Sequence, residues 1–408
     1  MTDRLRGVVN VIMCSGIVFL PGSLIFSFPG VMARYWMETF DVGRAQIGQI
    51  LFFVLAAVGI FMFLVGRLQE KMGPKWLAAM GSLLCAASVT MVGYATSINT
   101  VYLWAFLTGV SSAFLYLPAL TVVQLWFTRR RGLVSGLVNM SFALSAAIMG
   151  PIYTGLLRNM GYSSLTLLMG VLVLMVGLAA SAFIRFPALK PAEANTSSDQ
   201  MIPVASSMTL SQSLRTKSFW LLWLIWAFAG ASSIAMVTLS SAFGMAKGLS
   251  LQQAVLILTA FNLTNGFSRL FSGFISDIIG RKATLSFAFA IAGGAYLVMN
   301  HVEGLILWAI LATCIGISLG TLFSVSAPLV SDCFGMDHFG VIYGLVFTAY
   351  GFVAGALGPW LSGYLLDVTR DNFTLVFTYL GIFLFVSALL TQLITTETEC
   401  LPGNDMLA

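Results

Sequence analysis

The stretch FNLTNGFSRLFSG, residues 261–273, places polar side chains inside a segment apolar enough to cross a bilayer. Asn262, Asn265 and Arg269 follow helical steps, so they share one face of a helix. Arg269 precedes Asp277, at the expected end of this span, by roughly 12 Å of helix, which places it near the middle of a membrane. An arginine at that depth costs at least about 2.5–3.5 kcal/mol on insertion scales.

Arg269 has no visible partner inside the membrane, because no Asp, Glu or Lys falls in the interior of another expected span. Its planar guanidinium can bind a carboxylate through two parallel hydrogen bonds. We therefore interpret Arg269 as the site of an anion in a water-filled cavity. Asn265 is expected to fix the guanidinium or to accept a substrate hydroxyl, and Ser272 and Ser276 are expected to continue the cavity wall. The alternative is an arginine satisfied by backbone carbonyls at a helix break.

The composition indicates a polytopic membrane protein. Of 408 residues, 59% are hydrophobic and 9% are charged, whereas soluble domains carry about 25% charged residues. The basic pI is better explained by cytoplasmic loops than by nucleic-acid binding. Five scattered cysteines and two histidines lack metal-ligand spacing. We expect neither metal nor cofactor.

The chain offers twelve segments of the roughly 20 apolar residues that a span needs. They are 9–33, 44–68, 75–96, 100–126, 132–157, 163–185, 218–246, 251–277, 282–301, 304–328, 339–366 and 373–395. Residues 186–217 are rich in Pro, Ser, Ala and Thr, and we interpret them as a cytoplasmic linker between halves 1–185 and 218–408. A short surface helix is expected near Ser211–Lys217.

The basic residues predict the orientation. With both termini in the cytoplasm, fourteen of the 20 Lys and Arg residues fall on the inside and five on the outside, and Arg269 lies within a span. This bias is the one that cytoplasmic loops carry. We therefore expect an integral protein of the plasma (inner) membrane with both termini cytoplasmic.

An internal repeat relates the two halves. Residues 66–75 read GRLQEKMGPK and residues 273–282 read GFISDIIGRK, an offset of 207. Phe127 and Phe334 share that offset, and glycines of spans five and eleven match at an offset of 208. Such a parallel duplication is typical of transporters whose site lies between the halves at mid-membrane.

This repeated loop, G-x-L-x-D/E-x-x-G-x-R/K, resembles the signature of the major facilitator superfamily, and the resemblance covers the whole chain. It implies an all-α membrane protein with twelve transmembrane helices in two pseudo-symmetric six-helix bundles. The loops are expected to hold one conformation and release it in the other. The residues expected to do so are Gly66, Glu70, Gly73, Lys75, Gly273, Asp277, Gly280 and Arg281. Glu70 stands where Asp is usual. The alternative is a charged loop that only fixes topology.

Three further stretches narrow the resemblance. LWFTRRRGLVSGLV at 125–138, FDVGRAQIG at 40–48 and TKSFWLLWL at 216–224 resemble the monocarboxylate transporters and the oxalate:formate antiporters. Those proteins carry an essential arginine in span eight, and Arg269 occupies that place. The basic cluster in the first stretch also serves as a topology anchor.

The chain departs from this branch at three positions. Asn265 stands where monocarboxylate transporters usually have an acid, and Gly30 follows Phe28-Pro29 where they often have Lys. Oxalate:formate antiporters carry a lysine in span eleven, where this chain has Tyr350. One cation suits a monoanion, which favours lactate, pyruvate or another short acid over oxalate. The usual route of proton coupling is missing, so proton symport stays open.

The rest of the cavity wall is expected on the site helices that the resemblance implies. The candidates are Ile25, Tyr116, Phe142, Phe323, Phe347 and Tyr350. Tyr116 and Tyr350 are expected to donate hydrogen bonds to the anion. Simple packing is the alternative for every aromatic residue of this set.

The sequence predicts a secondary transporter working by alternating access, with a small carboxylate, the lipid bilayer and, if coupled, protons as its partners. No GxxxxGKS/T phosphate loop occurs, and no set of enzyme residues can be assembled. The alternatives are an oxalate/formate-type antiporter, an exporter of another organic anion or drug, and a transporter-like sensor. We expect the chain to work as a monomer.

Overall fold

The computed structural model describes residues 3–187, 207–370 and 372–396, and all regular elements in these ranges are helical. The first half contains α1 (Asp3–Phe26), α2 (Phe28–Phe40), α3 (Arg44–Val92), α4 (Ile98–Trp126), η1 (Thr128–Arg130), α5 (Arg131–Met160) and α6 (Tyr162–Phe183). The second half contains α7 (Leu210–Leu214), α8 (Lys217–Ala246), α9 (Leu251–Ile279), α10 (Arg281–Met299), α11 (Leu305–Phe334), α12 (Phe339–Thr348), η2 (Ala349–Ala354), η3 (Ala356–Trp360), α13 (Leu361–Thr369) and α14 (Phe373–Gln392).

Eleven helices in the described ranges are long and apolar enough to cross a membrane. One of them, Gln46–Val92, contains a break at Gly73 and therefore supplies two crossings. The expected twelve spans are confirmed. Span one is divided at Ser27 into α1 and α2, and span eleven runs from α12 through the π-helical segments η2 and η3 to α13.

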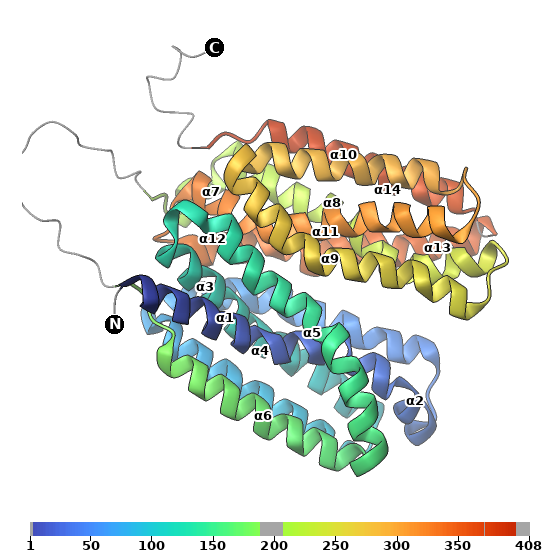
Figure 1. Ribbon diagram of the computed structural model, residues 1–408, viewed down its shortest axis with the longest axis horizontal. Helices are drawn as coiled ribbons and strands as arrows, with labels where there is room; N and C mark the ends of the chain where they lie inside the picture. The colour runs from blue at the N-terminus through green and yellow to red at the C-terminus, as the bar shows by residue number, and fades with distance from the viewer. Residues whose placement is uncertain (1–2, 188–206, 371, 397–408) are drawn as a thin grey trace, which may run out of the picture.

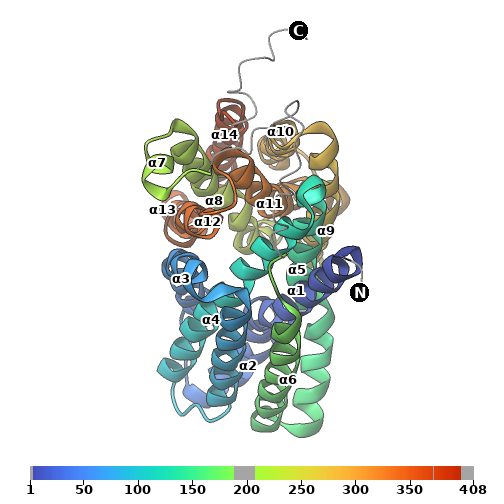
Figure 2. The same cartoon turned by 90° about the vertical axis from the view of Figure 1, so that its left-hand side faces the viewer.

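The spans form two bundles that face each other. Helices α1 to α6 make one bundle and α8 to α14 the other, and α5 meets α9 while α3 meets α12 between them (Figures 1 and 2). Helix α1 begins and α14 ends at the same end of the molecule, here called the terminal end (Figure 1). The other is the far end.

The expected linker falls largely on residues 188–206, which lie outside the described residues. The boundaries of the halves at 185 and 218 therefore stay predictions. The short helix expected near Ser211–Lys217 is observed as α7, and Lys217 already opens α8. Thr209 caps α7 through its side chain.

Equivalent glycines turn the chain in both halves. Gly73 and Gly280 occupy the same place in the repeated loop and have φ of 74° and 93°. A side chain is strained at such angles, whereas glycine adopts them freely. The repeat therefore specifies the same turn twice.

Glycine contacts join the halves at the terminal end. A Cβ added at Gly66 of α3 would collide with the carbonyl of Gly340 on α12. A Cβ at Gly132 of α5 would likewise collide with the carbonyl of Gly273 on α9, and the reverse also holds. Backbones can approach this closely only where small residues face each other. The terminal end is thus closed in this conformation.

The facing glycines Gly66 and Gly340 give a matched test of this closure. A Cβ at Gly340 would lie 3.3 Å from its nearest neighbours, so a small adjustment accommodates it. We expect Gly66→Ala to push α3 from α12, since overpacking costs about 1–3 kcal/mol, and Gly340→Ala to have little effect. The measurement is the spin-label distance between α3 and α12 at the terminal end of the purified protein. Wild-type distances in both variants would contradict the closure.

Candidate functional site

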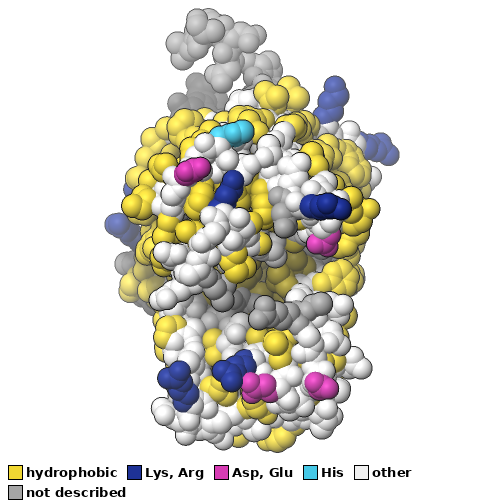
Figure 3. All heavy atoms as spheres, turned by 90° about the vertical axis from the view of Figure 1, so that its right-hand side faces the viewer, with side chains coloured by type: hydrophobic (Ala, Val, Ile, Leu, Met, Phe, Trp, Pro, Cys, Tyr) yellow, Lys and Arg dark blue, Asp and Glu magenta, His cyan; other side chains and the backbone are white. Residues whose placement is uncertain are grey.

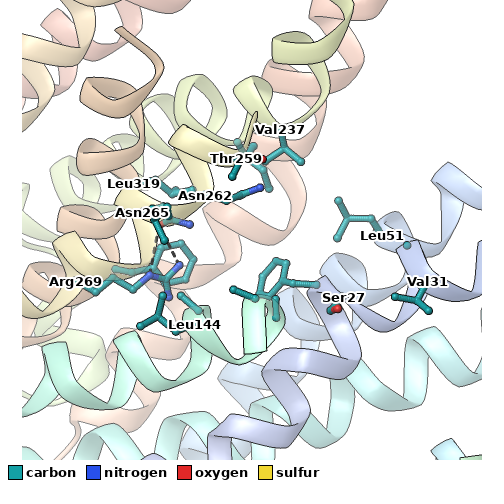
Figure 4. Close-up of a pocket in the computed structure, with 18 of the residues that line it drawn as sticks. Ser27, Val31, Leu51, Leu144, Val237, Thr259, Asn262, Asn265, Arg269 and Leu319 are labelled. Atoms are coloured by element: carbon teal, nitrogen blue, oxygen red, sulfur yellow. Dashed lines mark hydrogen bonds between the residues drawn. The ribbon is translucent and has the colours of Figure 1, made fainter. Parts of the chain in front are cut away.

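A cavity of about 480 Å3 lies between the two bundles. Both halves line it: Ser27, Val31, Leu51 and Leu144 come from the first, and Val237, Thr259, Asn262, Asn265, Arg269 and Leu319 come from the second (Figure 4). The far end of the molecule is hollowed along the line between the bundles (Figure 3). Of the described residues that line the cavity, Arg269 alone carries a charge.

Helix α9 supplies the polar wall of the cavity. Thr259, Asn262, Asn265 and Arg269 lie along it and lead from the far end into the middle of the bundle (Figure 4). The wall ends at the hydrogen-bonded pair Asn265 and Arg269, where α5 packs against α9.

The same α9 face does not continue as the sequence predicts. The Ser272 hydroxyl lies 2.6 Å from that of Thr321 on α11. Ser276 donates to the Gly273 carbonyl and accepts from Arg281. Neither serine lines the cavity, so the expectation that they extend its wall is wrong. The close contact of α5 with α9 below Arg269 leaves no cavity there for them to face.

Arg269 is 2% exposed and its contacts are neutral. Its Nε and Nη2 lie 3.4 and 3.3 Å from Asn265 Oδ1, and its Nη1 lies 3.4 Å from the Asn139 carbonyl. The guanidinium carbon lies 4.4 Å from the ring centroid of Phe323, a cation–π contact. No carboxylate among the described residues pairs with it.

These contacts leave binding capacity unused. A guanidinium has five N–H donors, and three of them are engaged with described residues. All three bonds are longer than the ~2.7–2.9 Å typical of charged pairs. A carboxylate arriving from the cavity therefore finds both free donors and weakly held ones.

Asn139 on α5 completes the surroundings of Arg269, and the sequence analysis missed it. Its carbonyl accepts from Arg269, its Oδ1 accepts from the Tyr116 hydroxyl at 2.6 Å, and its Nδ2 donates to the Ser135 carbonyl at 2.9 Å. Gly136 allows this approach, because a Cβ there would collide with the Arg269 carbonyl. A lone amide inside span five was the signal that could have identified it.

The remaining expected wall residues divide between two adjoining cavities. Phe323 and Tyr350 line the large cavity. They also line a smaller one of about 40 Å3, together with Ile25, Tyr116, Phe142 and Phe347. The structure thus brings these residues together, although the Tyr116 hydroxyl already donates a hydrogen bond to Asn139.

Metal binding has no support in the described ranges, where no group of three His, Cys, Asp or Glu side chains could hold an ion. Cys14, Cys85 and Cys314 are free thiols.

A charged network closes the terminal end next to α5. Asp277 accepts from the backbone N–H groups of Gly132 and Leu133 at 3.0 and 2.8 Å, and from Arg281 at 2.5 Å. A carboxylate at a helix N-terminus satisfies free N–H groups and favours the helix dipole. The second half therefore caps a helix of the first.

Asp332 on α11 extends this network, and the sequence analysis missed it. It accepts from Arg281 at 3.2 Å and from Arg131 at 3.3 Å. Its repeat position in the first half is Leu125, so the repeat gave no hint of it. We call Arg131, Gly132, Asp277, Arg281 and Asp332 the terminal gate.

The loop of the first half makes a different contact. Glu70 pairs with Nδ1 of His338, just before α12, at 2.7 Å. Lys75 places its ammonium 5.7 Å from the ring centroid of Trp76. The two halves of the repeat thus close the terminal end unequally, with the stronger set of contacts on Asp277.

A family model places the chain. The Major Facilitator Superfamily model matches residues 11–299 and 231–403. The chain belongs to the major facilitator superfamily. It is therefore an integral membrane transporter and not an enzyme. The fold agrees, since the Escherichia coli fucose:proton symporter FucP superimposes with a TM-score of 0.71 at 16% identity, covering 96% of this chain and 99% of FucP. FucP in the outward conformation gives a TM-score of 0.70.

Relatives within the superfamily confirm the resemblance seen in the loops. The oxalate:formate antiporter of Oxalobacter formigenes is 28% identical over 55% of this chain and 53% of its own length, so the match spans about half of that antiporter. Monocarboxylate transporter 2 of Meriones unguiculatus is 24% identical over 88% of this chain and 78% of its own. The agnestins efflux protein AgnL12 of Paecilomyces divaricatus is 25% identical over 90% and 83%.

The terminal gate predicts unequal effects at the two repeated carboxylates. Asp277→Asn removes the charge that caps α5 and binds Arg281, and we expect it to populate the conformation open at the terminal end about tenfold more, since such caps contribute about 0.5–2 kcal/mol. Glu70→Gln is the matched control and should shift this population less, because its pair with His338 is partly exposed. Thiol labelling of a cysteine placed on the α5–α9 contact measures the population of the open conformation in both variants. An equal effect at Glu70 would contradict the asymmetry.

Proposed function

We propose that this transporter moves a small monocarboxylate of the lactate or pyruvate type by alternating access, with Arg269 binding the carboxylate. The observation that carries the proposal is a buried guanidinium with unused donors, held by neutral groups at the inner end of a cavity. The names of two relatives, a monocarboxylate transporter and an oxalate:formate antiporter, support the same class of substrate.

Charge and shape support a monoanion. Arg269 is the single charged residue among the described residues that line the cavity, so one negative charge is matched. Asn262 and Asn265 offer partners for a hydroxyl or keto oxygen beside the carboxylate. Phe26, Ile234 and Val237 supply apolar contact for the remaining carbon atoms.

The same proposal includes the orientation. The excess of basic residues in one set of loops supports cytoplasmic termini in a plasma (inner) membrane. The cavity then faces outward and the terminal gate is cytoplasmic. The proposal takes a monomer as the working unit.

Two alternatives rest on particular observations. The relation to the oxalate:formate antiporter favours anion exchange, in which Tyr350 beside Arg269 would contact a second carboxylate. The efflux relative and a cavity larger than a three-carbon acid needs favour an exporter of a bulkier organic anion.

Uptake of radiolabelled L-lactate into proteoliposomes tests the proposal. It is competed with pyruvate, acetate, formate and oxalate at two pH values. Competition by monocarboxylates with oxalate inert supports the single-cation site, and uptake that rises at low pH adds proton symport. Uptake blocked by oxalate instead would favour the exchanger, and absence of saturable carboxylate transport would overturn the proposal.

Removing the cation at position 269 tests the proposed site directly. We expect Arg269→Ala to insert normally and to lower L-lactate uptake at least about 100-fold, because two charge-assisted hydrogen bonds of about 1.5–3 kcal/mol each are lost. Arg269→Lys should also fail, since an ammonium lacks the fork that binds both oxygens. Arg158→Ala, at an exposed position, is the control and should keep uptake. Normal uptake by well-expressed Arg269→Ala would remove Arg269 from the site.

Adding an acid beside the cation tests the role of Asn265. In Asn265→Asp, an ionised carboxylate would pair with Arg269 and compete with the substrate. Protonation removes this competitor, so we expect uptake to be low at neutral pH and to rise as pH falls. Asn262→Asp, one turn further from Arg269, is the control and should change the pH profile less. A profile identical to that of the wild type would count against the pairing.

A further inference from the structure

Several buried polar groups lie between Arg269 and the terminal gate without a hydrogen-bond partner among the described residues. They are the hydroxyls of Ser135, Ser326 and Tyr343 and the indole N–H of Trp226. All four side chains are at most 2% exposed. Ser135 lies one turn into α5 and Tyr343 one turn into α12, and both helices begin at the terminal end.

Contacts join Tyr343 to Ser326, Trp226 and Tyr116, and the Ser135 carbonyl accepts from Asn139, which also contacts Arg269. Tyr343 lies against the hydroxyls of Tyr116 and Ser326, yet it forms no hydrogen bond that meets normal geometry. Tyr116 donates to Asn139, whose carbonyl accepts from Arg269. The ring centroids of Trp226 and Tyr343 lie 6.4 Å apart. We call Ser135, Ser326 and Tyr343 the inner hydroxyls.

An unpartnered buried hydroxyl is unfavourable, and native proteins keep few of them. The inner hydroxyls come from α5, α11 and α12, and contacts of α5 and α12 with the other half close the terminal end. If α5 separated from α9 and α12 from α3, this region would become part of a cavity open to the terminal side. The hydroxyls would then be accessible to new hydrogen-bond partners.

We propose that the inner hydroxyls form a second carboxylate subsite, which receives the anion from Arg269 when the terminal end is open. The inference rests on the proposed function. Hydroxyl groups donate to carboxylate oxygens without the charge that makes Arg269 bind strongly. A weaker neutral subsite beside a strong cationic one lets the anion leave toward the terminal side.

Transport kinetics measured separately from each side of the membrane test the subsite. Tyr343→Phe removes the hydroxyl alone, and we expect the KM for L-lactate to rise about fivefold from the terminal side of vesicles of known orientation, as loss of one neutral hydrogen bond implies. From the far side the KM should stay within twofold. Ser240→Ala, which removes another unpartnered buried hydroxyl further along α8, is the control and should change neither value. Equal changes from both sides, or none, would overturn the subsite.

A second measurement does not depend on lactate. Tyr343→Cys is made in the full chain with its five cysteines replaced by alanine, with and without Asp277→Asn. We expect an anionic methanethiosulfonate to react several-fold faster than a cationic one, and only when Asp277→Asn opens the terminal end. No reaction in either background, or faster cationic reaction, would overturn the subsite. If wild-type protein transports no carboxylate while this labelling pattern holds, the proposed function fails and the subsite stands for another anion.

Discussion

The buried charge of Arg269 is the constraint on which the rest of the molecule depends. A guanidinium in mid-membrane needs compensation, and the groups around it supply partial charges only: the Asn265 amide, the Asn139 carbonyl and the face of Phe323. A carboxylate partner within the chain would neutralise the charge and compete with any anionic substrate. The neutral partners hold the guanidinium in place and leave its positive charge uncompensated.

Helix α5 connects this charge to the closed end. Its N-terminus is capped by Asp277, Gly136 brings it against the backbone at Arg269, and Asn139 holds the guanidinium. Asp277 and Arg269 both belong to α9. Separation of α5 from α9 therefore breaks the cap and the contact with the cation together. The surroundings of Arg269 and the terminal gate therefore depend on the same pair of helices.

The sequence predicted what depends on local periodicity and internal repetition. The twelve spans, the paired loops with Gly73 and Gly280, and the polar face through Asn262, Asn265 and Arg269 all follow from patterns within one segment.

Contacts between distant segments could not be predicted from such local patterns. Asp332 has no repeat-mate, and the partner of Glu70 is His338 in the other half. Ser272 shared the right face of an isolated helix, but α5 closes that level and the serine turns to Thr321. Tyr116 illustrates the same limit. The sequence offered its hydroxyl to an anion, whereas in the structure this hydroxyl donates to Asn139.

The most direct test of the central claim is an experimental structure of the full chain saturated with L-lactate, at a resolution that shows the carboxylate. The account predicts both carboxylate oxygens within about 3 Å of the guanidinium nitrogens of Arg269, with the carbon chain directed into the cavity toward Asn262. Lactate bound elsewhere while Arg269 keeps only its contacts with Asn265 and Asn139 would contradict it.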